Sequence, residues 1–206
     1  MSTPQHELHP DFRRPTGPDD LYTTRPPWDI DRPQTAFTAL AQAGEFHGRV
    51  LDIGCGTGEH ALLAAGLGHD TVGIDQSAQA IERAQRKARD RGLDATFLRH
   101  DALEPAGLTQ TFDTVLDCGL FHIFSPDARS TYVESLAAVL RPGGRYFMLG
   151  FSDRQPGIWG PHRLSRNDIE SAFTDGWRID SLRESFIEIL PDPTRSHAWL
   201  ATVTRS

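Results

Sequence analysis

RVLDIGCGTGE, residues 49–59, is the stretch that decides the fold of this chain. Its first half, 49–53, has the apolar character of a buried strand, and three glycines follow at alternating positions, Gly54, Gly56 and Gly58. A turn built from residues without side chains lets a ligand lie against the backbone at the start of the next helix. The stretch therefore predicts a strand, a ligand-binding loop and a helix.

Glu59 narrows the kind of ligand that we expect in this loop. A dinucleotide-binding pattern, Gly-x-Gly-x-x-Gly, would place its third glycine at this position, beside a pyrophosphate. A carboxylate would repel a pyrophosphate, but it would not oppose a cationic ligand that carries no phosphate. The pattern favours such a ligand, and a nicotinamide-dependent oxidoreductase stays open as an alternative.

Length, charge and cysteine content limit the function classes. The 206 residues fit one main domain with a substantial core, and no apolar run reaches the roughly 18 residues of a membrane span. The net charge of −7 argues against binding a phosphate backbone, so we expect neither a nucleic-acid nor a membrane partner. Cys55 and Cys118 form no paired motif, which favours a reducing cytoplasm. A monomer and a homodimer both stay open.

Strand and helix patterns alternate from residue 49 onward, which indicates an α/β protein with a parallel sheet. The expected strands are 49–53, 71–74, 95–99, 113–117 and 144–150, and the expected helices are 34–42, 58–66, 77–91 and 127–140. Two β-leaning runs near the end, 177–190 and 197–204, predict an antiparallel hairpin. The proline-rich residues 1–32 are expected to form an arm before the main domain, 33–206.

Aspartates follow the predicted strands at their carboxyl ends, where open α/β sheets bind ligands. Asp75 is placed to accept hydrogen bonds from two ribose hydroxyls. Asp101 could accept from an adenine amine, with the Ala102 amide beside the ring. Asp117 could hold an ammonium group through its carboxylate or its backbone carbonyl, and Asp52 adds negative potential in the loop. Each of these aspartates could instead only cap a helix or hold a loop.

In combination these motifs resemble the class I S-adenosylmethionine-dependent methyltransferases. The likeness covers about residues 34–204 and includes the turn LRPGG at 140–144. It implies a Rossmann-like seven-stranded methyltransferase sheet of order 3-2-1-4-5-7-6, with strand 7 antiparallel and helices on both faces. It implies S-adenosyl-L-methionine as the cofactor, bound by Asp52, Gly54, Cys55, Gly56, Gly58, Asp75, Gln76, Asp101, Ala102 and Asp117.

Three further segments narrow the likeness. PPWDIDRPQ at 26–34, FHIF at 121–124 and WGPHRLS at 159–165 resemble small-molecule methyltransferases of the thiopurine methyltransferase-like group, in particular bacterial enzymes that methylate heterocyclic toxins such as hydroxyquinolones. The resemblance implies that residues 1–32 form a lid over the active site. It places Trp28 and Gln34 at the acceptor pocket. Phe121, His122 and Trp159 lie in loops after predicted strands, and we expect them at the same pocket.

The expected reaction is methyl transfer to an O, N or S atom of a small aromatic or heterocyclic acceptor. Such a displacement mainly needs alignment of donor and acceptor, and an anionic acceptor needs no strong base. His122 is the candidate that positions or deprotonates the acceptor, although it could be only a core histidine. The residues show no metal-ligand spacing. A cofactor-binding module without catalysis stays open as a further alternative.

Overall fold

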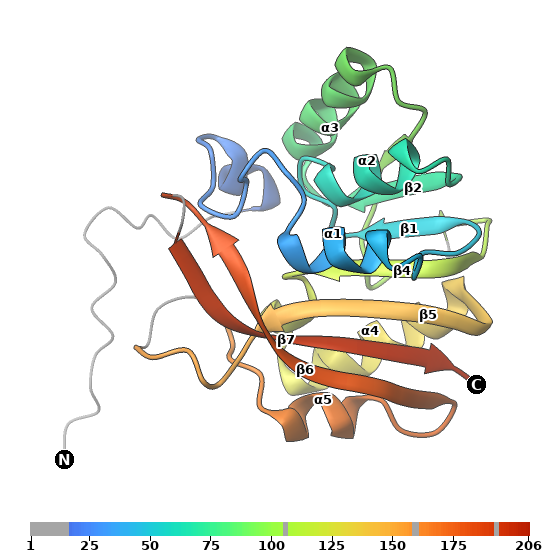
Figure 1. Ribbon diagram of the computed structural model, residues 1–206, viewed down its shortest axis with the longest axis vertical. Coiled ribbons are helices and arrows are strands. Elements are labelled where there is room, and N and C mark those ends of the chain that lie inside the picture. The colour runs from blue at the N-terminus through green and yellow to red at the C-terminus, as the bar shows by residue number, and fades with distance from the viewer. Residues whose placement is uncertain (1–16, 105–106, 158–160, 192–193) are drawn as a thin grey trace.

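The computed structural model describes residues 17–104, 107–157, 161–191 and 194–206 (Figure 1). This part of the chain forms a seven-stranded sheet of order β3-β2-β1-β4-β5-β7-β6. Its strands are β1 (Val50–Ile53), β2 (Thr71–Asp75), β3 (Thr96–Arg99), β4 (Phe112–Cys118), β5 (Leu140–Phe151), β6 (Trp177–Ile189) and β7 (Thr194–Arg205). The helices are α1 (Thr35–Gln42), α2 (Glu59–Gly66), α3 (Ala78–Arg91), α4 (Pro126–Val139) and α5 (Arg166–Ala172), with short 3₁₀ turns η1 (Pro18–Tyr22) and η3 (Phe121–Ile123).

Strand directions agree with the sequence-based expectation. β1 to β5 pair in parallel, and β7 pairs antiparallel with both β5 and β6. The predicted strand order and the antiparallel seventh strand are therefore confirmed. The order reverses between β1 and β4, and the carboxyl ends of strands at such a switch point form the ligand crevice of an open α/β sheet.

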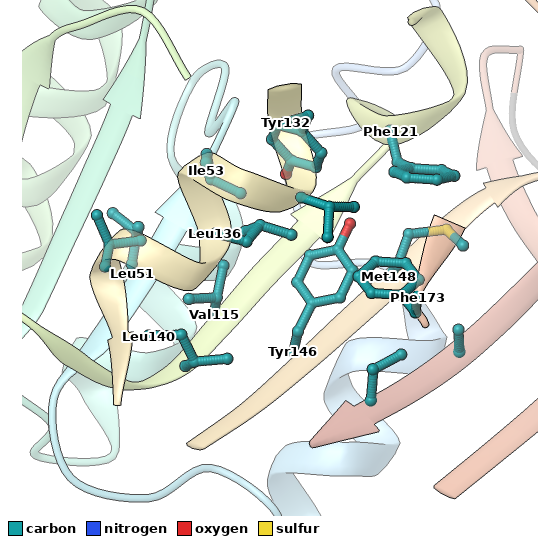
Figure 2. Packing of buried hydrophobic residues seen from close by; sticks show 14 of the residues in the cluster. Leu51, Ile53, Val115, Phe121, Tyr132, Leu136, Leu140, Tyr146, Met148 and Phe173 are labelled. Atoms are coloured by element: carbon teal, nitrogen blue, oxygen red, sulfur yellow. The ribbon is translucent and has the colours of Figure 1, made fainter. Parts of the chain in front are cut away.

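Helices cover both faces of the sheet, as expected (Figure 1). On one face, Leu51, Val115 and Tyr146 pack against Tyr132 and Leu136 of α4 (Figure 2). Strand residues with the opposite orientation, Phe147 and Leu149, pack against Phe37 and Leu40 of α1 on the other face. Burying each large apolar side chain stabilises the fold by about 1.5–3 kcal/mol. These two layers fix the strands whose ends carry the site.

Helix α3 follows directly from its local sequence. Ser77 precedes it, and the Ser77 hydroxyl accepts a hydrogen bond from the Ala80 amide at 3.1 Å. Gly92 ends it in a left-handed conformation, with φ of 62°. The buried residues Ala80, Ile81, Ala84 and Ala88 recur at helical spacing, so one face packs on the sheet.

Two parts of the fold differ from the expectation. The strand expected at 144–150 begins already at Leu140, which pairs with Phe112, and the register shifts before Arg145 pairs with Thr114. The LRPGG segment is thus an irregularity within β5 and not a turn that precedes it. Helix α5 was not expected, because Ile169 is its one fully buried residue and the apolar pattern is correspondingly weak.

Candidate active site

The glycine loop after β1 brings other parts of the chain against its bare backbone. Gly54 has φ of 69°, and a side chain there would meet Leu120 from the loop after β4 at 3.0 Å. Gly56 has φ of 52°, and a side chain there would meet the Tyr22 hydroxyl of the arm at 2.9 Å. Glycine is required at both positions because the conformation is left-handed and the space is filled. The glycine loop, the loop after β4 and the arm therefore converge.

Asp75 ends β2 beside the glycine loop and binds its backbone. The Gly56 amide donates to Asp75 Oδ2 at 2.9 Å, and the Ser77 amide donates to Oδ1 at 2.8 Å. Burial raises the pKa of this carboxyl group above its usual value. An ionised carboxylate has about four acceptor positions, so about one remains on each oxygen. Two vicinal hydroxyls, as in a ribose, fit the remaining capacity.

Asp101 and its neighbours lie at the end of the adjacent strand, β3. The His100 amide donates to the Asp75 carbonyl at 3.0 Å, which holds this segment next to β2. One Asp101 oxygen, Oδ1, accepts from the Leu103 amide at 2.9 Å, so Asp101 shapes its own turn. Ala102 packs against the hydrophobic core, whereas Gln76 is exposed. The second Asp101 oxygen is the one that could meet an adenine amine.

Asp52 and Asp117 are buried beneath the glycine loop. Asp52 Oδ2 accepts from the Ala61 amide of α2 at 2.9 Å, and burial raises its pKa to about 7. Asp117 accepts from the hydroxyls of Tyr132 at 2.8 Å and Tyr146 at 2.7 Å and from the Leu120 amide at 2.8 Å. These donors occupy the Asp117 carboxylate and turn it into the core. The expectation that this carboxylate holds an ammonium group needs correction, and only its backbone carbonyl stays a prediction.

Glu59 is neutralised by cations of α3. Its carboxylate accepts from Lys87 Nζ at 2.8 Å and from both terminal nitrogens of Arg91 at 2.8 Å. Burial opposes ionisation, but these cationic donors lower the Glu59 pKa below its usual value. Because the charge of Glu59 is paired within the protein, Glu59 would not repel a pyrophosphate as a bare carboxylate would, and that expectation needs correction.

His122 lies in η3, directly after β4, and is 6% exposed. Its Nδ1 accepts a hydrogen bond from the Phe151 amide at 2.9 Å, and its ring packs against the Phe151 ring with centroids 5.0 Å apart. Burial, together with electrostatic interactions with His162 and Arg129, lowers the His122 pKa to about 3. His122 is therefore neutral at physiological pH. Leu120, which directly precedes η3, is the side chain that packs on Gly54, so the glycine loop contacts the chain just before His122.

Residues 50–144 match the family described as Methyltransferase domain. Over 172 residues, 82% of this chain and 75% of the relative, the sequence is 36% identical to 2-heptyl-1-hydroxyquinolin-4(1H)-one methyltransferase of Mycobacteroides abscessus. The chain belongs to the S-adenosylmethionine-dependent methyltransferases. S-adenosylmethionine is its methyl donor, and the paired backbone amides and spare acceptor capacity of Asp75 fit the ribose of that nucleoside.

Two further relatives of this methyltransferase differ in what they act on. A solved structure described as "Conversion of a Disulfide Bond into a Thioacetal Group during Echinomycin Biosynthesis" superimposes with a TM-score of 0.82 at 40% identity, covering 89% of this chain and 86% of its own. The tRNA 5-carboxymethoxyuridine methyltransferase of Escherichia coli O157:H7 is 37% identical over 180 residues, 84% of this chain and 62% of the relative.

Some of the residues that we expect to contact the acceptor of this methyltransferase are buried in the protein. Phe121 is fully buried and stacks on Phe173 with ring centroids 5.7 Å apart, so it belongs to the core and offers no wall to an acceptor. The amide of Gln34 pairs with the β6 backbone, donating to the Glu188 carbonyl at 2.9 Å and accepting from the Glu188 amide at 2.8 Å. Both expectations need correction, because long-range packing uses these side chains. Trp159 lies outside the described residues.

Trp28 lies on the arm and is 45% exposed, which is compatible with a wall of the acceptor pocket. Neither cysteine is prepared for covalent catalysis, since burial raises the pKa of both the Cys55 and the Cys118 thiol well above its usual value. Among the described residues, no cluster of three or more His, Cys, Asp or Glu side chains could hold a metal ion. None of the described helices is long and apolar enough to cross a membrane.

Sequence reasoning missed the contacts that hold the arm on the site. Asp19 Oδ1 accepts from the Ser77 hydroxyl at 2.7 Å, and Asp29 Oδ1 accepts from the Thr57 hydroxyl of the glycine loop at 2.9 Å. Lys87 Nζ lies 3.1 Å from Asp31 Oδ1. One signal was available, because Lys87 is the single lysine of the chain and shares a helix face with Arg91, four residues later.

Proposed function

We propose that this methyltransferase transfers a methyl group to an O, N or S atom of a small aromatic or heterocyclic acceptor. One geometric observation carries the proposal. The loop after β4 packs Leu120 directly against Gly54 of the glycine loop and continues into His122. In this proposal His122 meets the acceptor close to the cofactor loop. The M. abscessus relative, which is named for a hydroxyquinolone, supports an acceptor of that class.

Each cofactor group has a counterpart in this arrangement. Asp75 and Gln76 would hold the ribose, Asp101 and Ala102 the adenine, and the glycine loop with the Asp117 carbonyl the amino-acid end. The ionised form of Asp52, just before the loop, would favour a cationic ligand, because opposite charges attract strongly where water is excluded. S-adenosylmethionine supplies an electrophilic methyl group on a sulfonium. The protein then needs to align the acceptor with it and exclude water.

Residues 1–32 act as a lid in this proposal, of which the part from residue 17 onward is described. Support comes from the direct contacts of Asp29 with Thr57 and of Tyr22 with Gly56. Arg83 Nη2 also donates to the Tyr22 carbonyl, and the Leu190 amide at the end of β6 donates to the Pro27 carbonyl at 2.7 Å. Opening these contacts would admit ligands, and closing them would exclude water.

A nucleic-acid acceptor is the second candidate, because one relative is named as a tRNA methyltransferase. The net charge of −7 opposes it, since binding a phosphate backbone requires clustered Lys and Arg. Our proposal excludes a nucleic-acid partner and a membrane partner. It places the enzyme in the cytoplasm, supported by the two free cysteines, as a monomer or a homodimer.

Mass spectrometry of acceptors incubated with the protein and S-adenosylmethionine tests the function. The panel contains hydroxyquinolones, aromatic thiols, phenols and azoles, with transcribed tRNA as a separate arm. Methylation confined to the small acceptors is the expected result. Methylation of tRNA alone would overturn the acceptor class. Calorimetric binding of S-adenosylhomocysteine without methylation of any acceptor would favour a non-catalytic binding module, and preferential binding of a nicotinamide dinucleotide would favour an oxidoreductase.

A further inference from the structure

The orientation of His122 fixes which of its ring nitrogens carries the proton. A backbone N–H can only donate, so Nδ1, which faces the Phe151 amide at 2.9 Å, must be unprotonated. The single proton of the neutral ring is therefore on Nε2. Protonating Nδ1 would set two donors against each other, and for this reason His122 cannot take up a second proton without breaking the contact with β5.

The Nε2 edge of the ring is left uncovered by Gly119. A side-chain carbon at this position would lie 3.4 Å from His122 Cε1 and 3.5 Å from Nε2, and glycine omits it. Within the part of the chain that the structure describes, the hydrogen bond of the His122 side chain runs through Nδ1 and none occupies Nε2. Nε2–H is a hydrogen-bond donor available to a ligand that approaches from the end of β4.

Arg129 and His162 both act electrostatically on His122. Arg129 of α4 is 6% exposed and stacks over the Phe121 ring at 5.4 Å. Its Nη1 binds Asp168 of α5 at 3.0 Å, but its buried Nε finds no hydrogen-bond partner among the described residues. His162 lies close enough to act on His122 electrostatically. A hydrogen-bond donor in the field of a buried guanidinium favours a negatively charged ligand.

We propose that the acceptor binds as a preformed anion and that His122 donates a hydrogen bond to it through Nε2–H, with no proton transfer to the enzyme. The inference deepens the proposed function and rests on it. The acceptor loses its proton to solvent before it binds. Its lone pair then forms the bond to the methyl carbon, the carbon–sulfur bond breaks, and that electron pair stays on sulfur. The proton of His122 stays on Nε2 throughout.

This assignment selects a substrate class. Acceptors whose O–H, S–H or N–H group ionises near neutral pH can arrive as anions, as aromatic thiols, acidic phenols and N-hydroxy heterocycles do. Aliphatic alcohols remain protonated and would require a general base. His122 cannot serve as that base, because Nδ1 accepts from the Phe151 amide and Nε2 already carries a proton. Within the panel of small acceptors, ionised ones are therefore expected to be methylated and weakly acidic ones to be left unmodified.

The ionisation state of a bound chromophore tests the inference without turnover. We would titrate 4-nitrophenol, whose anion absorbs at longer wavelength than the neutral phenol, with the full chain and S-adenosylhomocysteine between pH 5 and 9. The apparent pKa of the bound probe is expected to fall by about one unit, a tenfold preference for the anion. His122→Gln, which keeps an N–H donor but cannot act as a base, should retain most of the shift, whereas His122→Leu should abolish it.

Control measurements separate this inference from the proposed function. His47→Gln makes the same chemical change at an exposed position before β1, at the amino end of that strand, and should leave the shift intact. S-adenosylhomocysteine affinity, measured on every variant, shows that the site is folded. Absence of binding or of a shift in the unmodified protein overturns the inference, and so does equal loss in His122→Gln and His122→Leu. Either result can occur while small acceptors are still methylated, whereas a lack of methylation refutes the function itself.

Discussion

Lys87 of α3 donates a hydrogen bond from Nζ to Glu59 Oε1 at 2.8 Å, and the same ammonium reaches both the glycine loop and the arm. It donates to the Thr57 hydroxyl at 2.9 Å and lies 3.1 Å from Asp31 Oδ1. One side chain therefore connects the first turn of α2, the glycine loop and the arm. The lysine side chain is only 20% exposed, so solvent screens these contacts weakly.

Replacing Lys87 by methionine is expected to destabilise the protein and to loosen the arm. The apolar stem is kept while Thr57 loses its cationic donor and Asp31 keeps only its ion pair with Arg25. Glu59 keeps Arg91. The free energy of unfolding should fall by about 1–3 kcal/mol, as measured by urea denaturation, and proteolytic cleavage near residues 17–33 should accelerate.

Arg86→Met is the matched control for this prediction. Arg86 lies on the same helix, is 58% exposed and pairs with Glu82 at 3.2 Å, a surface contact of about 0.5 kcal/mol or less. If both variants lose equal stability and the arm is cleaved at the unmodified rate, the connection through Lys87 does not hold the arm.

Asp75→Ala should weaken the binding of S-adenosylhomocysteine by about 1–3 kcal/mol, because the ribose hydroxyls would lose their acceptor. The Gly56 and Ser77 amides would lose theirs too, which loosens the glycine loop. Isothermal titration calorimetry measures the affinity. Asp70→Ala is the control. It removes an exposed carboxylate that is paired with Arg49 just before the start of the same strand, and the affinity for S-adenosylhomocysteine should not change. Unchanged affinity in Asp75→Ala would refute the ribose assignment.

The parts of the fold that the sequence predicts are those determined by local chemistry. Ser77 and Gly92 mark the ends of α3 because each satisfies or terminates helical backbone groups within a few residues. The glycine loop is equally local, and Asp75 at the end of β2 follows from strand alternation. Strand order then follows from the resemblance, because no local pattern specifies which strands are neighbours.

What the sequence could not predict depends on partners far along the chain. The Asp117 carboxylate accepts hydrogen bonds from the hydroxyls of Tyr132 and Tyr146. Nothing in the sequence indicates that these two tyrosines lie next to Asp117. Glu188 of β6 accepts from the Thr35 amide at 3.0 Å and so caps α1 from a strand at the other end of the chain. In the sequence, Phe121 looks like an aromatic residue that could line an acceptor pocket. In the structure it stacks on Phe173 and is buried in the core.

Acid should destabilise the protein through His60. The His60 Nε2 accepts a hydrogen bond from the backbone amide of Gln34 at 3.2 Å, and burial lowers the His60 pKa from 6.5 to about 4. Between these two values the unfolded chain binds a proton that the folded protein does not, so stability is full above about pH 6.5 and falls as the pH drops towards 4. The loss from this one group amounts to about 3 kcal/mol at pH 4.

Urea denaturation at pH 7, 5.5 and 4 measures this dependence. His60→Phe keeps the ring packing on Phe37 but cannot be protonated, so its stability should fall less steeply with pH than that of the unmodified protein. His47→Gln, an exposed control, should leave the slope unchanged. Equal slopes for the unmodified protein and His60→Phe would show that other groups cause the acid sensitivity.

Gly119→Ala should impair the methylation of small acceptors without weakening cofactor binding. Gly119 has φ of 83°, and the added carbon would lie 3.5 Å from His122 Nε2, covering the edge that we assign to the acceptor. An alanine in this left-handed conformation also costs about 1–2 kcal/mol of stability. Gly143→Ala is the matched control, because its φ of 79° imposes the same backbone cost while nothing lies within 4 Å. Both variants should unfold at similarly reduced urea concentrations, but only Gly119→Ala should raise the KM for the acceptor. A KM raised equally in both would mean that lost stability, and not the covered imidazole edge, causes the defect.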